Sequence, residues 1–312
     1  MFRVAVFLVA LFGTLSAVSG FFSITSDDSG KYLAAADRND GIYVSSNYGA
    51  NWNWTTAHTS NTWTGLSSDG TGKKLALASS AVLPYVSNDG GFSWTQSASG
   101  HATTAASSSP LIAADGTGKN LVLAGSDDLY LSSDGGSSWT AAGIKPYPAQ
   151  QAIDYSADGS TIVYSYNNFI SVAKNGKWLG PTASPAAVWY SVSTSQDGSV
   201  IAGVIYDPNS DFNPNAAAQR GVYLSTDGGA SYATLVVSAA SYEYFYAVEV
   251  SDDGKLLFYS GSGGLWVYNI ATKTTTFSDL PVKPMPNDYA VYTVASSSTG
   301  HTSGNPAVRP MR

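Results

Sequence analysis

The sequence predicts an all-β fold, a β-propeller of six four-stranded blades, with seven blades as the alternative. Only 12% of the 312 residues are charged, against about 25% in typical domains, and exposed helix faces normally carry such charges. Two turn motifs alternate along the chain and divide it into six units of about 40 to 56 residues. That period, with four short strands in each unit, is typical of propeller blades.

Residues 1–20 have the pattern of a secretory signal peptide. Met1–Arg3 is short and basic, Val4–Phe12 is wholly apolar, and Ala17-Val18-Ser19 places small residues at a cleavage site. No other apolar run is long enough to cross a bilayer. We therefore expect a secreted, extracellular protein with no membrane partner; an uncleaved anchor is the alternative.

Each predicted blade begins with an inner strand that ends at an Asp-Gly or Ser-Gly turn. Both turn residues tolerate positive φ, so such a turn between two apolar runs is a strong hairpin signal. The apolar second strand follows the turn. The six turns lie at Ser26–Gly30, Asp69-Gly70, Asp115-Gly116, Asp158-Gly159, Asp197-Gly198 and Asp253-Gly254.

The third and fourth strands are joined by a more specific motif, Ser-x-Asp-x-Gly-x-x-Trp, which we call the box. Its Asp is expected to accept hydrogen bonds from turn amides, its Gly to be left-handed, and its aromatic residue to pack inward on the next strand. Copies start at Ser45, Ser87, Ser132 and Ser225, and Ala173–Trp178 is a shortened copy. Because catalysis needs one site and the box recurs, we predict that its residues are structural. They are Asn47, Trp52, Asp89, Trp94, Asp134, Trp139, Asp227 and Tyr232.

The order of strands predicts where the two motifs lie. Successive hairpin turns alternate between the two ends of a blade, so the Asp-Gly turns and the boxes should share one rim. The opposite rim receives the loops between strands two and three and the connectors between blades, which vary widely in length. Variable loops on a rigid scaffold are where binding usually resides. We therefore expect the functional face to lie opposite the boxes.

The loop-rich rim collects aromatic and polar side chains. Rings stack on sugar faces while amides and carboxylates bond to hydroxyls, so this combination is typical of recognition sites. The alternative is that the aromatic residues fill the spaces between blades. The ligand-binding candidates are Asp37, Arg38, Asp40, Trp63, Asp128, Trp189, Tyr190, Asp207, Arg220, Glu243 and Tyr244.

The turns and boxes resemble those of Asp-box, or BNR-repeat, propellers of the sialidase superfamily, including sortilin-type and photosystem II assembly factor-type domains. The resemblance runs from about Phe21 to Leu280 and implies a propeller fold. Sialidases of this superfamily use three arginines, a Tyr–Glu pair and an Asp, with an Arg-Ile-Pro signature. Here the repeats contain only Arg38 and Arg220 and no Arg-Ile-Pro, so sialidase activity is not expected. The basic surface patch of the photosystem propellers is not evident either.

The propeller is expected to span residues 21–295, followed by a flexible Ser/Gly/Pro-rich tail at 296–312. Tyr289–Val294 echoes the inner strand Tyr246–Val250. This segment either covers the seam next to the first blade or belongs to a seventh blade.

The leading functional hypothesis is a secreted, non-catalytic propeller that binds a glycan or an extracellular protein through its loop-rich rim. One alternative is a glycoside hydrolase with two carboxylates about 5 to 10 Å apart; the other is a purely structural scaffold. No catalytic residue is assigned, and the hydrolase candidates are Asp37, Asp40, Asp128, Asp207, Asp211 and Glu243.

Composition excludes several other classes. The chain has no cysteine, which removes disulfides, zinc–thiolate sites and cysteine nucleophiles. Its three histidines share no metal-ligand spacing, so we expect neither a metal nor a cofactor. A net charge of −7 with scattered lysines provides no basic stripe for nucleic acid. We expect a monomer.

Asn53-Trp54-Thr55 is the one N-glycosylation sequon of the sequence. Side chains alternate along a strand, so an inward Trp52 would point Asn53 to solvent. A glycan at Asn53 would shield the outermost strand of its blade.

Overall fold

The computed structural model describes residues 21–37, 41–55, 63–80, 82–98, 111–125, 127–144, 152–166, 168–205, 220–237, 245–261 and 264–278. Several sequence-based expectations fall outside these ranges. They are the signal peptide, the C-terminal tail, and the candidate residues Arg38, Asp40, Asp207, Asp211, Glu243 and Tyr244.

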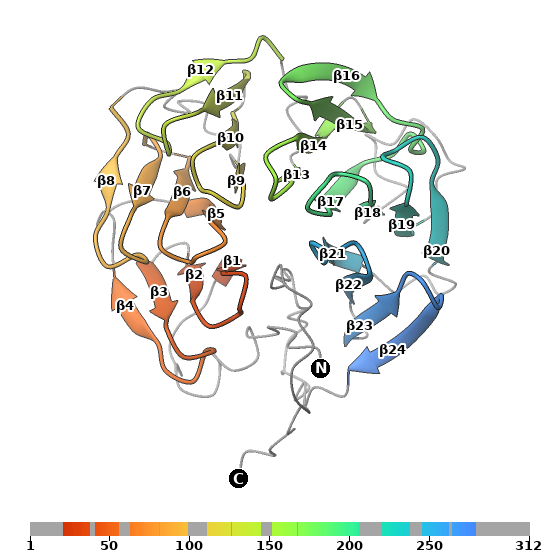
Figure 1. The fold of residues 1–312 in the computed structure, drawn as a ribbon, viewed down its shortest axis with the longest axis horizontal. Coiled ribbons are helices and arrows are strands. Elements are labelled where there is room, and N and C mark those ends of the chain that lie inside the picture. The colour runs from red at the N-terminus through yellow and green to blue at the C-terminus, as the bar shows by residue number, and fades with distance from the viewer. Residues whose placement is uncertain are drawn as a thin grey trace.

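The described residues form six antiparallel four-stranded sheets, set in a ring as the blades of a propeller (Figure 1). The prediction of an all-β, six-bladed fold is confirmed. Blades one to three contain β1 (Phe21–Ser26), β2 (Leu33–Asp37), β3 (Gly41–Ser45), β4 (Asn53–Thr55), β5 (Trp63–Ser68), β6 (Leu75–Ser79), β7 (Tyr85–Ser87), β8 (Thr95–Gln96), β9 (Leu111–Ala114), β10 (Leu121–Ala124), β11 (Leu129–Ser132) and β12 (Thr140–Ala141). Blades four to six contain β13 (Ile153–Tyr155), β14 (Thr161–Tyr166), β15 (Phe169–Lys174), β16 (Lys177–Pro181), β17 (Trp189–Thr194), β18 (Ile201–Ile205), β19 (Gly221–Ser225), β20 (Ala233–Val237), β21 (Phe245–Val250), β22 (Leu256–Gly261), β23 (Gly264–Asn269) and β24 (Thr274–Ser278).

The first strand of each blade lies nearest the centre of the ring and the fourth lies outermost (Figure 1). The middle strands are mainly apolar, because they pack against neighbouring blades; β2, β6 and β18 are buried along their whole length. Apolar clusters fill the spaces between consecutive blades. One of them joins blades one and two around Trp63 and Leu77, and another joins blades four and five around Trp189 and Ile201.

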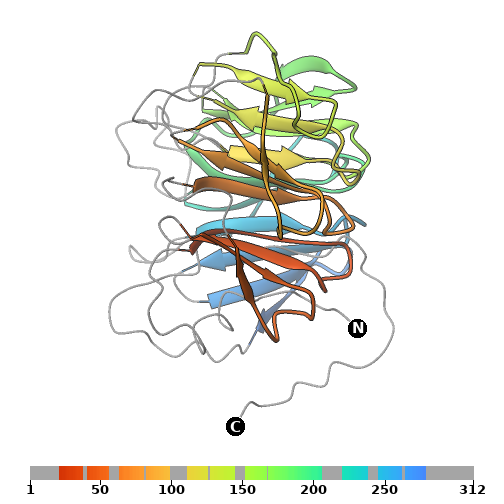
Figure 2. The same ribbon diagram turned by 90° about the vertical axis from the view of Figure 1, so that its left-hand side faces the viewer.

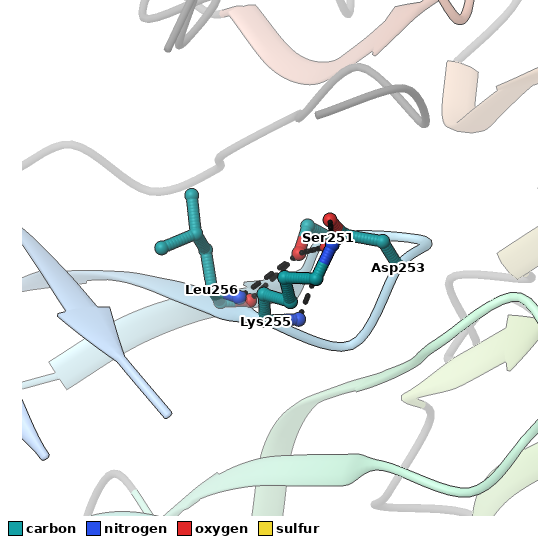
Figure 3. A network of polar contacts seen from close by, with 4 residues as sticks. All are labelled: Ser251, Asp253, Lys255 and Leu256. Atoms are coloured by element: carbon teal, nitrogen blue, oxygen red, sulfur yellow. Dashed lines mark hydrogen bonds and ion pairs between the residues drawn. The ribbon is translucent and has the colours of Figure 1, made fainter. Parts of the chain in front are cut away.

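The turns between strands one and two are closed by a small polar residue, the first turn residue. In blade two this is Asp69, whose carboxylate accepts the N–H of Lys73 (3.0 Å) and of Lys74 (3.1 Å). In blade six it is Ser251, whose hydroxyl donates to Asp253 (2.8 Å) and accepts the N–H of Leu256 (3.0 Å), as Figure 3 shows. The first turn residues are Asp27, Asp69, Asp115, Ser156, Ser195 and Ser251.

These turns and the turns between strands three and four lie on one rim, which we call the turn rim. Backbone bonds join the two turns within a blade, from Gly90 N–H to Lys73 O (2.8 Å) and from Gly135 N–H to Lys119 O (2.9 Å). Figure 2 shows these turns on the right-hand side of the ring. The expectation that both motifs share a rim is therefore confirmed.

Inner strands are sheet edges, and side chains of the preceding blade bond to their exposed N–H groups. Ser67 Oγ accepts the N–H of Ala114 (3.0 Å) in the next blade. Asp154 Oδ2 and Ser193 Oγ accept in the same way, from Thr194 (2.8 Å) and Val250 (3.0 Å) respectively. Each acceptor lies two residues before the first turn residue of its blade, so one sequence position ties consecutive blades together.

A second set of bonds joins neighbouring blades along the turn rim. The residue after the first turn residue donates its N–H to the corresponding carbonyl of the next blade, as in Gly70 to Gly116 (2.9 Å) and Gln196 to Asp252 (2.9 Å). In blade four the donor is instead Asp158, which donates to Gln196 (3.1 Å). The chain of bonds starts at Asp28, which donates to Gly70 (3.0 Å).

Blades six and one are the exception in this ring. Each other pair of consecutive blades has extensive contacts between its inner strands, whereas β21 and β1 have no comparable contact within the described ranges. In Figure 1 a wider sector separates blades six and one than separates any other neighbours. No helix among the described residues has the length and apolarity needed to span a membrane.

Candidate functional site

The boxes are built by one repeated set of hydrogen bonds. Ser132 Oγ donates to Asp134 Oδ1 (2.8 Å) and accepts the N–H of Gly136 (2.9 Å). Asp134 Oδ1 also accepts the N–H of Ser138 (2.9 Å), and Trp139 Nε1 donates to Gly136 O (3.2 Å). The copies at Ser87 and Ser225 have the same Ser–Asp–Gly bonds.

The box carboxylates are held in their ionised form. The hydroxyl and N–H of Ser138 lower the pKa of Asp134 to about 2. The equivalent bonds from Ser231 lower the pKa of Asp227 to about 2. Each of these carboxylates is therefore an acceptor that fixes its turn, and the structural role of the box residues stays a prediction.

Blade one carries a variant box. Asn47 Oδ1 accepts from Ser45 Oγ (3.0 Å) and from the N–H of Asn51 (2.9 Å), so an amide oxygen replaces the carboxylate. Tyr48 has a φ of 61° where the boxes of blades two and three have a glycine at 77° and 71°. A bulky residue in this left-handed region is uncommon, and Tyr48 is 40% exposed.

The variant box of blade one suggests a test of the acceptor role of the box aspartate. Asp134→Asn is expected to fold with an unfolding midpoint close to that of the wild type, because Asn47 shows that an amide oxygen supports the same turn. Asp134→Ala should lower the midpoint in urea, because the N–H of Ser138 and the hydroxyl of Ser132 lose their acceptor. Unfolding followed by tryptophan fluorescence measures both variants; equal losses for Asn and Ala would contradict this role.

Three predicted ligand-binding residues of the loop-rich rim are buried, namely Trp63, Trp189 and Asp37. Each is 1% exposed, so the expectation that they meet a ligand is wrong. A bulge lies directly after each tryptophan, between Trp63 and Gly65 and between Trp189 and Ser191. The bulge breaks the alternation of side chains, and both rings turn into the spaces between blades. They pack edge-on against tyrosines, Trp63 on Tyr85 (5.9 Å) and Trp189 on Tyr223 (5.4 Å).

The remaining described candidates on that rim are separate from one another. Asp128 accepts the N–H groups of Gly143 (3.1 Å) and Ile144 (2.8 Å), so its carboxylate holds the segment after β12. Tyr190 is 51% exposed, and Arg220 is half-buried before β19. Of the six hydrolase candidates only Asp37 and Asp128 lie in the described ranges, and they belong to blades one and three. The described ranges hold no cluster of three metal-binding side chains.

The aromatic residues of the boxes are buried or half-buried, whereas the sequon is exposed. Trp139 is buried, while Trp52, Trp94 and Tyr232 are half-buried. Asn53 is exposed on the outermost strand β4, and its neighbour Trp54 is 55% exposed as well. The sequon is thus accessible at the edge of blade one.

A pocket of about 130 Å³ lies between blades one and two on the turn rim. Its apolar lining comes from Leu33, Ala34, Val44 and Leu75. The other lining residues are Tyr32, Ser45, Ser46, Ser68, Gly72, Lys73, Asp89, Gly90 and Phe92. Two of these expose aromatic surface, since Tyr32 is 38% and Phe92 is 63% exposed.

Sequence reasoning missed this pocket, although the repeats contain a signal. Tyr32 takes the place that Lys74 has in blade two, and Phe92 takes the place of Ser137 in blade three. Phe92 departs from the small residues Ala50, Ser137 and Ala230 at its place in the other boxes, and it meets Tyr32 at the interface of blades one and two. Only the fold shows that these positions are adjacent.

The lysines of the described residues gather on the same rim. They are Lys31, Lys73, Lys74, Lys119, Lys174, Lys177, Lys255 and Lys273. Lys31 Nζ lies 5.0 Å from the centre of the Tyr32 ring, and Lys73 lines the pocket. The aspartates of this rim bind turn amides and hydroxyls, as Asp69 and Asp134 do. The pocket is therefore bordered by the ammonium groups of Lys31 and Lys73 and by the carboxylate of Asp89, which is held by Ser87 and Ser93.

Comparisons with known proteins give no match to any protein-family model. No curated protein matches the chain either. The chain is, however, similar to several solved structures. YCF48 bound to D1 peptide is 16% identical with a TM-score of 0.60, over 84% of this chain and 83% of that one. YCF48 from Cyanidioschyzon merolae is 13% identical with a TM-score of 0.59, over 84% and 85%.

The GH74 xyloglucanase from Xanthomonas campestris is 16% identical with a TM-score of 0.60, over 82% of this chain. The chain spans only 46% of that enzyme's length. At identities this low, the similarity of these structures shows that the chain is a β-propeller.

Proposed function

We propose that this protein is a non-catalytic binding module that holds a partner polypeptide on its turn rim. An apolar side chain of the partner enters the pocket between blades one and two, and acidic residues beside it meet the lysines. The observation that carries this proposal is the pair of exposed aromatic residues, Tyr32 and Phe92, at the entrance of an apolar pocket.

The size of the pocket favours one side chain over a whole small molecule. Ligand sites for drug-sized molecules are typically about 300–1,000 Å³, whereas an engineered cavity of about 150 Å³ binds benzene. The present pocket of about 130 Å³ suits a Phe or Leu side chain. Burying such a side chain stabilises a complex by about 1.5–3 kcal/mol.

Charge favours an acidic partner segment. Lys31 and Lys73 border the pocket, and ammonium groups at the rim of an interface steer carboxylates toward it. Asp89 also lines the pocket, but its carboxylate already accepts hydrogen bonds from Ser87 and Ser93. YCF48, one of the structural neighbours, was solved with a peptide bound. The GH74 enzyme is only 16% identical, so its similarity shows the fold and adds no argument for hydrolysis here.

We infer that the protein acts outside the cell. This inference rests on the signal-peptide pattern of residues 1–20 and on the exposed sequon at Asn53. The repeated Ser–Asp–Gly bonds of the boxes further support membership of the Asp-box group.

Peptide binding to the secreted chain tests the proposal. The probe is a synthetic peptide with a central Phe between Glu residues, compared with peptides in which Ala replaces Phe or Lys replaces Glu. Calorimetry should detect binding of the first peptide only. Phe92→Ser, which copies Ser137 of the next blade, should weaken it by about 10- to 100-fold.

Two matched variants decide which rim binds. Leu179→Ser removes an equally exposed side chain from β16 and should leave binding unchanged. Tyr190→Ser removes the exposed aromatic residue of the loop-rich rim and should also leave it unchanged. Loss of binding in Tyr190→Ser with full binding in Phe92→Ser would refute the proposal, as would a glycan array that finds the only ligands among sugars.

A further inference from the structure

The turn between β15 and β16 contains the one Asn-Gly pair of the sequence, Asn175-Gly176. The two residues have φ of 49° and 72° and form a two-residue hairpin turn, in which both central residues are left-handed. Both are exposed. A Cβ added at Gly176 would have no heavy atom within 4 Å beyond those of its chain neighbours, so the turn projects into open space there.

An asparagine that is followed by glycine can lose its side-chain amide without an enzyme. The backbone nitrogen of the glycine attacks the side-chain carbonyl carbon, and glycine has no Cβ to obstruct the approach. An aspartate followed by glycine closes the same ring with loss of water and reopens as isoaspartate. In both cases the attacking N–H has to be released from any hydrogen bond, so the structure decides which pairs react in the folded protein.

Hydrogen bonds distinguish Asn175-Gly176 from the Asp-Gly pairs of the turns and boxes. In the box of blade three, Gly135 donates its N–H to Lys119 O (2.9 Å), and Asp134 accepts from Ser132. Among the described residues, by contrast, neither the N–H of Gly176 nor the side chain of Asn175 has a hydrogen-bond partner. The glycine N–H is bonded to a backbone carbonyl in all eight described Asp-Gly pairs, at Gly70, Gly90, Gly116, Gly135, Gly159, Gly198, Gly228 and Gly254.

We propose that Asn175 is a site of spontaneous deamidation in the folded protein. The nitrogen of Gly176 bonds to Cγ of Asn175, the Cγ–Nδ2 bond breaks, and the amide leaves as ammonia with the proton of the Gly176 N–H. Water then opens the cyclic imide. Attack of water at Cγ gives aspartate, and attack at the main-chain carbonyl gives isoaspartate. The net reaction consumes one water and releases one ammonia, and the residue gains a carboxylate.

The isoaspartate product changes the outer edge of blade four. Its backbone runs through the former side chain and is one atom longer, in a turn that pairs Lys174 with Lys177 across the hairpin. The next residue of β16, Trp178, packs edge-on against Tyr164 with ring centres 5.3 Å apart. We expect the longer turn to disturb this pairing of β15 with β16. The pocket between blades one and two is formed by other residues and should keep its binding.

Ageing of the folded chain tests the proposal, with the same chain unfolded in guanidinium chloride as the reference. Both samples are held at pH 8.5 and 37 °C and then digested with chymotrypsin. A gain of about 1 Da in peptide 170–178 measures deamidation. Methylation by an isoaspartate methyltransferase measures isoaspartate at each site. Asn175→Gln is the control for the peptide mass, because glutamine would have to close a larger ring and should show no gain.

Asn175 should react in the folded chain at no less than about a tenth of its rate in the unfolded chain, because an exposed turn opens at little cost. Isoaspartate at Asp134 should form in the folded chain at less than about a tenth of its unfolded rate, because Gly135 is bonded. A folded chain that protects Asn175 more strongly than this would overturn the proposal. Folded Asp134 that forms isoaspartate as fast as Asn175 would also overturn it, since the hydrogen bonds would then not select the site.

Discussion

Trp189→Ala is expected to lower the free energy of unfolding by about 3 to 5 kcal/mol, the usual cost of truncating a buried tryptophan. The ring is 1% exposed and lies in the apolar cluster between blades four and five. A Cβ added to Gly203 would lie 2.7 Å from its Cε3 atom, so the ring packs directly on the backbone of β18.

Urea unfolding followed by circular dichroism measures this effect. The control is Tyr190→Ala, at the neighbouring position in the chain, where the ring is 51% exposed. Substitution of an exposed side chain usually changes stability by less than about 0.5 kcal/mol. Similar midpoints for the two variants would contradict the inward orientation of Trp189.

The fold could be predicted from the sequence because its turns are local. The bonds of a box involve residues within seven positions of each other, as from Ser132 to Trp139. Such residues specify a hairpin wherever they occur. Six hairpin pairs with apolar strands between them leave few ways to bury those strands other than a ring.

The orientation of individual side chains could not be predicted in the same way. Trp63 and Trp189 precede bulges, and a bulge shifts the alternation that a sequence pattern assumes. Tyr190, the extra residue of one bulge, is exposed instead of its neighbour. A pattern of residues identifies the strand but not the irregularity that determines which ring faces solvent.

The pocket could not be predicted from the sequence for a different reason. Its walls come from positions far apart in the sequence, such as Tyr32 in blade one and Phe92 in blade two. Variable loops predict a functional face on the opposite rim, whereas the pocket lies among the stereotyped turns. Substitutions within the stereotyped turns create this pocket, and comparison of equivalent positions across repeats is the signal that would have found them.

Asp154 is expected to make stability depend on pH between about pH 4 and pH 7. Its carboxyl group is enclosed between blades four and five, although the residue as a whole is half-buried. Desolvation by burial raises its pKa to about 7, against the opposing effect of the N–H groups of Thr194 and Tyr155. The charge of Asp252 raises this pKa further.

The sign of the effect follows from proton binding. In the unfolded chain the pKa of an aspartate is about 3.9. Between about pH 4 and pH 7 the folded protein therefore keeps a proton on Asp154 that the unfolded chain has lost. Stability from this group is fully present below about pH 4, falls as the pH rises to about 7, and is constant above that. The full change is on the order of 4 kcal/mol.

Asp154→Ser isolates this contribution. Serine supplies the hydroxyl acceptor that Ser67 and Ser193 use at the same place in their blades, and it does not titrate. The difference in unfolding free energy between wild type and variant should change steadily in favour of the variant as the pH rises from 4 to 7. Asp134→Asn is the control, because the pKa of Asp134 is about 2 and its carboxylate does not titrate in this range. Urea unfolding at a series of pH values measures all three proteins. If the curves of wild type and Asp154→Ser run parallel through this range, Asp154 does not bind the proton on folding, and its carboxylate is as well solvated as an exposed one.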